Sequence, residues 1–137
     1  MWEAVLEHLA GCLPNEGVAL VATHPEIREA DRPWHAHRLY RGSNTRNSPV
    51  RFEMDAREII AALREIDREG WHLGAIVHSH PNGPPTPSPT DLAEAAYPES
   101  LMVIVSWSSG TPEARAWSLE PDGNGWKPRA VPIEIAP

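Results

Sequence analysis

The amino-acid sequence of this 137-residue chain predicts an α/β protein in which a mixed β-sheet is flanked by helices. Three observations support this prediction. Segments with apolar residues at helical spacing lie among short apolar runs of the kind that form strands. One of these runs, residues 101–106, is continuously apolar up to its last residue, which is typical of a central strand covered on both faces. The elements follow one another as helix, strands, helix, strand, helix, strands, an order that suits a mixed sheet between helices.

The chain begins with a predicted helix. Residues 2–10 carry apolar side chains at helical spacing, and Gly11 is expected to end the helix. Residues 16–22 are then typical of a strand, with a glutamate at its start. The next segment, residues 24–47, is polar and rich in proline, arginine and histidine. We interpret it as a variable loop that leads into a strand at residues 36–41.

A half-buried strand and a second helix are expected next. Residues 49–54 alternate between outward and inward side chains, as in a strand with one buried face. Asp55 is placed to cap a helix over residues 56–69, which Gly70 terminates. The apolar stripe of this helix belongs to the core and consists of Ile59, Ala62, Leu63 and Ile66.

The remaining strands are expected at residues 73–77, 101–106, 114–119 and 126–135. The first of these is an apolar run that suits a buried strand and leads directly into His78. The third alternates in the manner of a half-buried strand. The last supplies one or two edge strands, because Pro128 and Pro132 interrupt it and proline cannot donate to a neighbouring strand.

Length, charge and cysteine content narrow the class of protein. The chain is expected to form one domain, 1–137, large enough to fold without disulfides. Its net charge of -7 argues against general nucleic-acid binding, which needs a basic surface. Cys12 is the only cysteine, so no internal disulfide can form. Neither a signal peptide nor a long apolar run is present, which predicts no membrane association and a cytoplasmic location. The sequence leaves open whether the chain forms a homodimer.

One segment, from His78 to Asp91, combines metal-ligand side chains with a helix start. His78 and His80 lie two residues apart at a strand end, so their imidazoles point the same way. Ser88 at the N-cap, Pro89 at the first helical position and Asp91 at the third mark the N-terminus of a helix. This helix would return the Asp91 carboxylate to the histidines. Two imidazoles and one carboxylate form a common ligand set for catalytic Zn²⁺, which keeps a fourth position open.

Simpler explanations exist for each part of this segment. A His-x-His pair is usually incidental, and a helix cap alone explains Ser88 and Asp91 without any metal. The metal hypothesis is favoured by the combination of a strand end, a proline-stiffened loop and a capped helix. A second pair, His35 and His37, is not followed by a capped helix that carries a carboxylate. We expect these two to be surface residues or neighbours of a substrate groove.

The pattern His-x-His-Pro followed by Ser-x-x-Asp resembles the motif of the JAMM, or MPN+, zinc metallopeptidases. The residues at its defining positions are His78, His80, Ser88 and Asp91. The resemblance is to the small, single-domain bacterial branch and covers roughly residues 3–135, including the segments 14–16, 47–55 and 96–98. One departure is visible, because that branch usually has Cys-Gly two residues after its catalytic Glu. This chain has Val18-Ala19 there, a change expected to alter packing under the site rather than chemistry.

The resemblance implies a three-layer sandwich similar to the cytidine-deaminase-like fold, with one Zn²⁺ per chain held by His78, His80 and Asp91. Glu16 would be general base and then general acid as zinc-bound water attacks a peptide or isopeptide bond. Ser88 would donate a hydrogen bond to the developing oxyanion, cap the helix, or do both. On spacing alone, Glu16 would be a solvated group at a strand end. Ser79 faces the other side of its strand and is left with a packing or supporting role.

The substrates implied by the resemblance are ubiquitin-like or sulfur-carrier proteins, cut after a Gly-Gly tail. Such a tail could add as a strand at a sheet edge, where narrow walls would select glycine. A related zinc amidohydrolase is the first alternative, acting on a cell-wall peptide or small conjugate or in a RadC-like role. A non-catalytic MPN binding module is the second. Zinc deaminases are excluded, because their motif needs a cysteine pair that this chain lacks.

Overall fold

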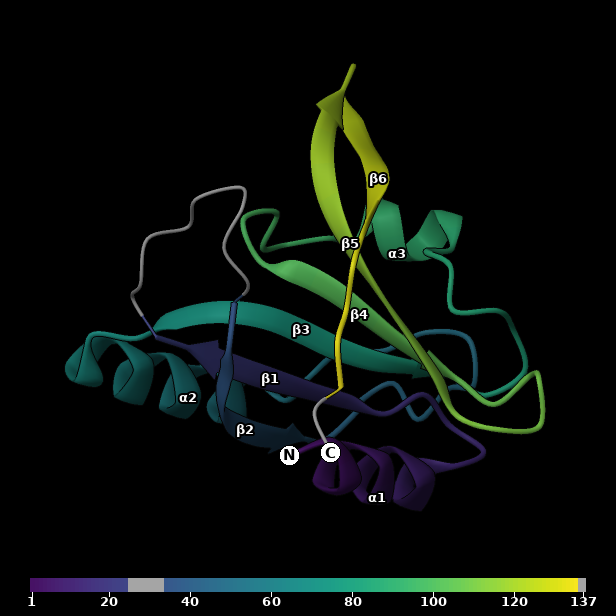
Figure 1. Cartoon of the computed structure of the whole chain (residues 1–137), viewed down its shortest axis with the longest axis horizontal. Helices are drawn as coiled ribbons and strands as arrows, with labels where there is room; N and C mark the ends of the chain where they lie inside the picture. Colours follow the sequence, from purple (N-terminus) through teal and green to yellow (C-terminus); the bar gives the residue numbers. More distant parts are fainter. Residues whose placement is uncertain (25–33, 136–137) are drawn as a thin grey trace.

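The computed structural model describes residues 1–24 and 34–135, which form six strands and three helices (Figure 1). In chain order these are α1 (Trp2–Cys12), β1 (Val18–Thr23), β2 (Ala36–Gly42), α2 (Ala56–Glu69), β3 (His72–His80), α3 (Pro89–Ala93), β4 (Leu101–Ser106), β5 (Glu113–Asp122) and β6 (Gly125–Val131). The predicted variable loop falls largely on residues 25–33, outside the described ranges. Within those ranges, no helix is both long and apolar enough to cross a membrane.

The strands form one mixed sheet in the order β2-β1-β3-β4-β5-β6. β3 and β4 run parallel and are joined by the segment that contains α3, whereas the other neighbouring pairs are antiparallel. Because parallel strands end at the same edge of a sheet, the last residue of β3, His80, lies beside the last residue of β4, Ser106. The end of the predicted metal-ligand strand is therefore deep in the sheet, with β1 on one side and β4 on the other.

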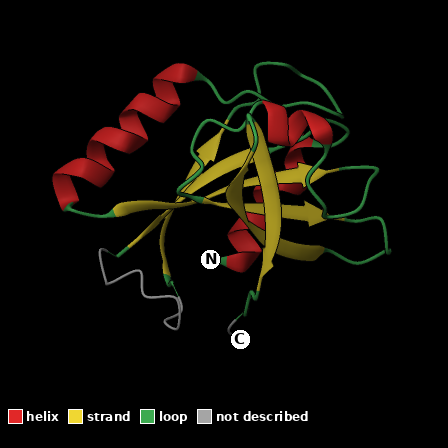
Figure 2. Cartoon of the chain, turned by 90° about the horizontal axis from the view of Figure 1, so that it is seen from above, coloured by secondary structure: helices red, strands yellow, loops and turns green. Residues whose placement is uncertain are grey.

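Helices cover both faces of the sheet, which confirms the predicted three-layer arrangement (Figure 2). On one face, Val5 and Leu9 of α1 pack against buried residues of β1, β3, β4 and β5. On the other face, Ala62 of α2 packs with Val18 and Leu20 of β1. The side chains of strand residues alternate between these two cores. From Ile76 onward, past a register shift in its pairing with β1, the even-numbered residues of β3, which include both histidines of the motif, belong to the α2 face.

Most predicted elements are confirmed, including the central strand at 101–106 and the second helix. Asp55 caps α2 by accepting a hydrogen bond from the Arg57 amide, and Gly70 ends it in the left-handed conformation, with φ of 72°. The predicted edge strand is β6, which occupies the end of the sheet order. β1 begins two residues later than expected, so that Glu16 lies just before the strand.

Two predictions need correction. Gly11 does not end α1, which continues to Cys12 and stops because Leu13 precedes a proline and leaves the helical region. Residues 49–54 form no strand. They run as an extended loop with a single bridge between Asn44 and Met54, because the Asn44 side chain takes the backbone hydrogen bonds that a neighbouring strand would have made. The helix start predicted at Ser88 is confirmed, and the helix itself is one short turn, Pro89–Ala93.

Candidate metal centre

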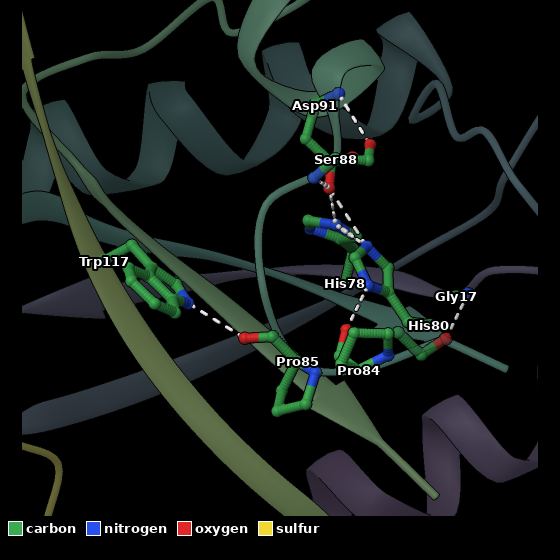
Figure 3. A network of polar contacts seen from close by, with 9 residues as sticks. Gly17, His78, His80, Pro84, Pro85, Ser88, Asp91 and Trp117 are labelled. Atoms are coloured by element: carbon green, nitrogen blue, oxygen red, sulfur yellow. Dashed lines mark hydrogen bonds and ion pairs between the residues drawn. The ribbon is translucent and has the colours of Figure 1, made fainter. Parts of the chain in front are cut away.

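His78 and His80 extend from the same face of β3 and are both buried, with 0 % and 8 % of their surface exposed. The strand alternation predicted from the sequence therefore holds. Ser79, between them, faces the opposite side, where its hydroxyl accepts a hydrogen bond of 2.8 Å from the Gly17 amide. Figure 3 shows the two imidazoles pointing toward the start of α3.

The N-terminus of α3 brings Asp91 to the histidines. Ser88 is the N-cap, and a capping box links the two residues: the Ser88 hydroxyl accepts from the Asp91 amide at 3.0 Å, and the Ser88 amide donates to Asp91 Oδ2 at 2.9 Å. Pro89 starts the helix with its φ preset. The helix-cap explanation and the metal-ligand explanation of Asp91 are therefore not exclusive, because one carboxylate serves the helix and faces the imidazoles.

Three potential ligand atoms converge at this point. Nε2 of His78 lies 3.2 Å from Nε2 of His80, and Asp91 Oδ2 lies 3.2 Å and 3.0 Å from these two nitrogens. A tetrahedral ion with bonds of about 2.0–2.1 Å would place neighbouring donors about 3.3 Å apart. All three side chains are buried, and no other group of three or more such ligands occurs in the described part of the chain. The cluster therefore fits a metal ion in spacing and in donor chemistry.

The loop between β3 and α3 fixes one of the candidate ligands, His80. The carbonyl oxygen of Pro84 lies 2.7 Å from His80 Nδ1, an arrangement in which Nδ1 carries the proton and Nε2 keeps its lone pair for a metal. The flanking carbonyls are also bound: Gly83 accepts from the Ser106 hydroxyl, and Pro85 accepts from the Trp117 indole at 3.0 Å. Three consecutive carbonyls of this loop are thus held by β3, β4 and β5.

Electrostatics of the cluster favour a neutral His78 and an ionised Asp91. Complete burial lowers the pKa of His78, whose ring also stacks on Phe52 with centroids 4.5 Å apart. Burial alone would raise the pKa of Asp91, but hydrogen bonds from the two histidines outweigh it and hold the pKa well below its usual range. Neutral imidazole and carboxylate are the protonation states that bind divalent metals.

Glu16 lies near the cluster, two residues before the start of β1. Val18 pairs with His78, and the Ser79 amide donates to the Gly17 carbonyl at 3.1 Å, so the antiparallel pairing continues toward Glu16 and His80. Glu16 is 3 % exposed, and the Oε1 atom of its carboxyl group has no hydrogen-bond partner among the described residues. Burial raises its pKa to about 7, although nearby His80 acts in the opposite direction. An unpartnered buried carboxyl group is costly, which is typical of a functional group.

Gly17 lets the chain just before β1 pack closely against α1. A Cβ atom at position 17 would lie 2.8 Å from the side chain of Leu9 and 3.1 Å from the Cys12 sulfur. The next two residues, Val18 and Ala19, are completely buried in the opposite faces of the sheet. The predicted effect of the departure at these positions, a change in packing beneath the site, stays a prediction.

The second histidine pair lies at the other end of the sheet. His35 and His37 are exposed near the pairing of Thr23 with Ala36, whereas the cluster adjoins the start of β1. The His37 ring contacts those of His24 and Trp71, with centroids 4.0 and 4.6 Å away. No third ligand joins these histidines in the described ranges.

Several residues at the site were missed from the sequence. They are Asn44, Phe52, Ser106 and Trp117, each of which reaches the site from a distant element. The local sequence carried no signal for them, because a lone Asn, Phe, Ser or Trp has no characteristic spacing. Only the pairing of strands far apart in the chain brings them here.

An apolar cavity of about 580 Å³ adjoins the cluster on the α2 face. His78 and Asp91 line it together with apolar side chains that include Leu20, Met54, Ile76, Met102 and Leu119. Arg51 and Glu94, which form an ion pair between the 44–54 loop and the end of α3, line it as well. Cavities of this size and composition are typical of ligand sites.

The raised pKa of Glu16 predicts how the stability of the metal-free protein changes with pH. A carboxyl group with a folded pKa of about 7 and an ordinary value of 4.5 stabilises the fold only while protonated. Stability therefore falls by about 3 kcal/mol as the pH rises from about 4.5 to 7. We expect Glu16→Gln to remove this part of the pH dependence, measured by urea unfolding between pH 5 and 8. Identical pH slopes in the two proteins would contradict the assignment.

The described fold and site place the chain in a class: α/β proteins in which a mixed sheet presents a buried His-His-Asp site suited to a metal ion. Residues 1–120 match the family described as prokaryotic homologs of the JAB domain, and the chain belongs to this family. This membership confirms the resemblance to JAMM-type proteins drawn from the sequence.

Named relatives and a solved structure are similar over most of the chain. A probable TtuB-protein conjugate cleaving protease of Thermus thermophilus is 34 % identical, over 88 % of this chain and 72 % of its own. A desampylase of Haloferax volcanii is 31 % identical, over 96 % of this chain and 91 % of its own. The solution structure of protein DSY2949 from Desulfitobacterium hafniense superposes with a TM-score of 0.76 at 28 % identity, covering 98 % of this chain and 89 % of that one.

Proposed function

We propose that this protein is a zinc-dependent metallopeptidase or isopeptidase that cleaves after the Gly-Gly tail of a ubiquitin-like or sulfur-carrier protein. The observation that carries the proposal is the convergence of His78, His80 and Asp91, with a buried, unpartnered Glu16 beside them. Membership of the JAB family supports the metal-dependent type of hydrolysis, and the names of the two relatives support cleavage of protein conjugates.

His78, His80 and Asp91 would hold the ion, which when bound lowers the pKa of a water molecule and polarises a carbonyl group. Glu16 Oε1 accepts a proton from the attacking water and later delivers it to the nitrogen of the leaving amine. In the metal-free protein burial raises the pKa of Glu16 to about 7, and a carboxyl group of raised pKa is a stronger proton acceptor, which supports this role. Its burial keeps competing water away.

Ser88 fits the role of oxyanion donor without giving up its role as a cap. Its oxygen accepts from the Asp91 amide, which uses a lone pair and leaves the hydroxyl proton. Within the described ranges, no acceptor is bonded to that proton. Ser88 therefore has a donor available beside the ligand set, and a preorganised donor of this kind is worth roughly 3 kcal/mol in the transition state.

The substrate part of the proposal rests on the resemblance and on the names of the relatives. A conjugate or C-terminal extension on a carrier protein presents an extended tail, which could pair with backbone groups along the site. The apolar cavity supports binding of an apolar substrate group next to His78 and Asp91. A ubiquitin-like or sulfur-carrier protein is accordingly the partner we propose.

Cleavage of a defined substrate tests this proposal. The protein is incubated with two substrates: a ubiquitin-like sulfur carrier extended beyond Gly-Gly, and a carrier linked to a lysine side chain. The masses of the products are measured by mass spectrometry. We expect a cut directly after Gly-Gly that a chelator abolishes and one equivalent of Zn²⁺ per chain restores. Cleavage of only a cell-wall peptide or a small conjugate would favour the amidohydrolase alternative. Tight zinc binding without any cleavage would favour the binding module.

A further inference from the structure

Asn44 connects Glu16, two residues before β1, to the loop that follows β2. Its Nδ2 donates to the carbonyl oxygen of Glu16 at 2.9 Å and to that of Arg51 at 3.0 Å. Its Oδ1 accepts from the amides of Arg46 and Glu53, both at 3.0 Å. Both donors and both acceptor positions of this side-chain amide are therefore used, an arrangement that fixes the side chain in one orientation.

The backbone of Glu16 is held on both sides by the same loop. Its amide donates to the Ser48 carbonyl at 2.8 Å, and its carbonyl accepts from Asn44. The following residue, Gly17, is fixed to Ser79 of β3. The carboxyl group, in contrast, has an oxygen without a partner. The direction of the Glu16 side chain toward the cluster therefore depends on its backbone, and Asn44 is the only side chain bonded to that backbone among the described residues.

We propose that Asn44 is a positioning residue for Glu16, an inference that rests on the proposed role of Glu16 as the proton carrier. The 44–54 loop that Asn44 organises also carries Phe52, which stacks on the metal-facing His78. The 44–54 loop thus holds the backbone of Glu16 and packs against the candidate ligand His78. Asn44 acts through the backbone of Glu16 and does not touch the reacting atoms.

The neighbouring residue provides a matched control. The Thr45 hydroxyl donates to the Glu53 carbonyl at 3.0 Å, so it fastens the same loop as Asn44, although Thr45 is exposed to solvent and Asn44 is half-buried. The described hydrogen bonds of Thr45 go to Glu53, and none goes to Glu16. Thr45→Val removes one loop hydrogen bond, whereas Asn44→Asp keeps the shape of the side chain and replaces the two donated bonds by an oxygen facing two carbonyl oxygens.

The first test needs neither metal nor substrate. Amide hydrogen exchange at Glu16 and Gly17 is followed by NMR in the metal-free wild type, Asn44→Asp and Thr45→Val. We expect exchange at Glu16 to be at least about tenfold faster in Asn44→Asp, and unchanged in Thr45→Val after correction for global stability. Equal exchange at Glu16 in all three proteins would overturn the proposal, as would equal acceleration in the two variants.

The second test uses the zinc-loaded protein and a cleaved substrate. We expect Asn44→Asp to lower kcat roughly ten- to hundredfold, with KM within about twofold and metal content unchanged, because misplacing a catalytic group mainly affects the transition state. Thr45→Val should match the wild type. A rise in KM with unchanged kcat would show that Asn44 serves substrate binding instead. If the wild type cleaves nothing, the proposed function fails, while the exchange measurement still decides whether Asn44 holds Glu16.

Discussion

Replacing Glu16 by glutamine should lower kcat by about 10²- to 10⁴-fold while the protein keeps its bound metal. Glutamine has nearly the same shape as glutamate but cannot accept a proton. The three converging ligand atoms come from His78, His80 and Asp91, so the ligand set stays intact in this variant. Removing the buried carboxyl group also removes the cost of its burial, so the loss of activity should not be accompanied by a loss of stability.

The measurement compares wild type and Glu16→Gln at equal zinc content, with cleavage followed under single-turnover conditions. Glu113→Gln is the control, because Glu113 forms an exposed ion pair with Arg115 on β5 and has no part in the proposed chemistry. This control should cleave at the wild-type rate. Glu16→Gln activity within tenfold of the wild type, at full zinc occupancy, would show that another group carries the proton.

The parts of the site that were predictable are those set by short-range spacing. His78 and His80 share a face because a strand alternates, and Ser88 and Asp91 meet because a capping box brings the N-cap residue and the third helical residue together. Fourteen residues of sequence therefore contain the whole candidate ligand set, counted from 78 through 91. In the same way, Asp55 and Gly70 marked the ends of α2 correctly.

The unpredictable parts depend on contacts between distant segments. Glu16 reaches the cluster because β1 pairs antiparallel with β3 in a register that sets Val18 against His78, and no local pattern encodes that register. Only the family resemblance identified Glu16 beforehand. The segment 49–54 alternates like a strand but is a loop, because the Asn44 side chain satisfies its backbone groups in place of a neighbouring strand. The structure of segment 49–54 therefore depends on Asn44, a side chain outside the segment.

Asp91→Asn should weaken zinc binding by more than about 100-fold. Even the loss of a residue that only supports a ligand typically costs 10- to 100-fold in metal affinity, and Asp91 supplies one of the three converging atoms itself. Asparagine keeps an oxygen that can accept from the Ser88 amide, but it carries no charge to offset that of the ion. The affinity is measured by competition with a chromophoric chelator at neutral pH.

Asp91 has two roles in the structure, and the control has to separate them. Asp55→Asn makes the same substitution in a residue that also bonds a backbone amide at a helix N-terminus but lies on α2 and belongs to no ligand group. If capping alone mattered, both variants would bind zinc like the wild type, since asparagine keeps the side-chain oxygen that accepts from a backbone amide in each case. If Asp91 is a ligand, only Asp91→Asn loses affinity. Zinc affinity within tenfold of the wild type in Asp91→Asn would therefore reject His78, His80 and Asp91 as the ligand set and leave the capping box as the reason for Asp91.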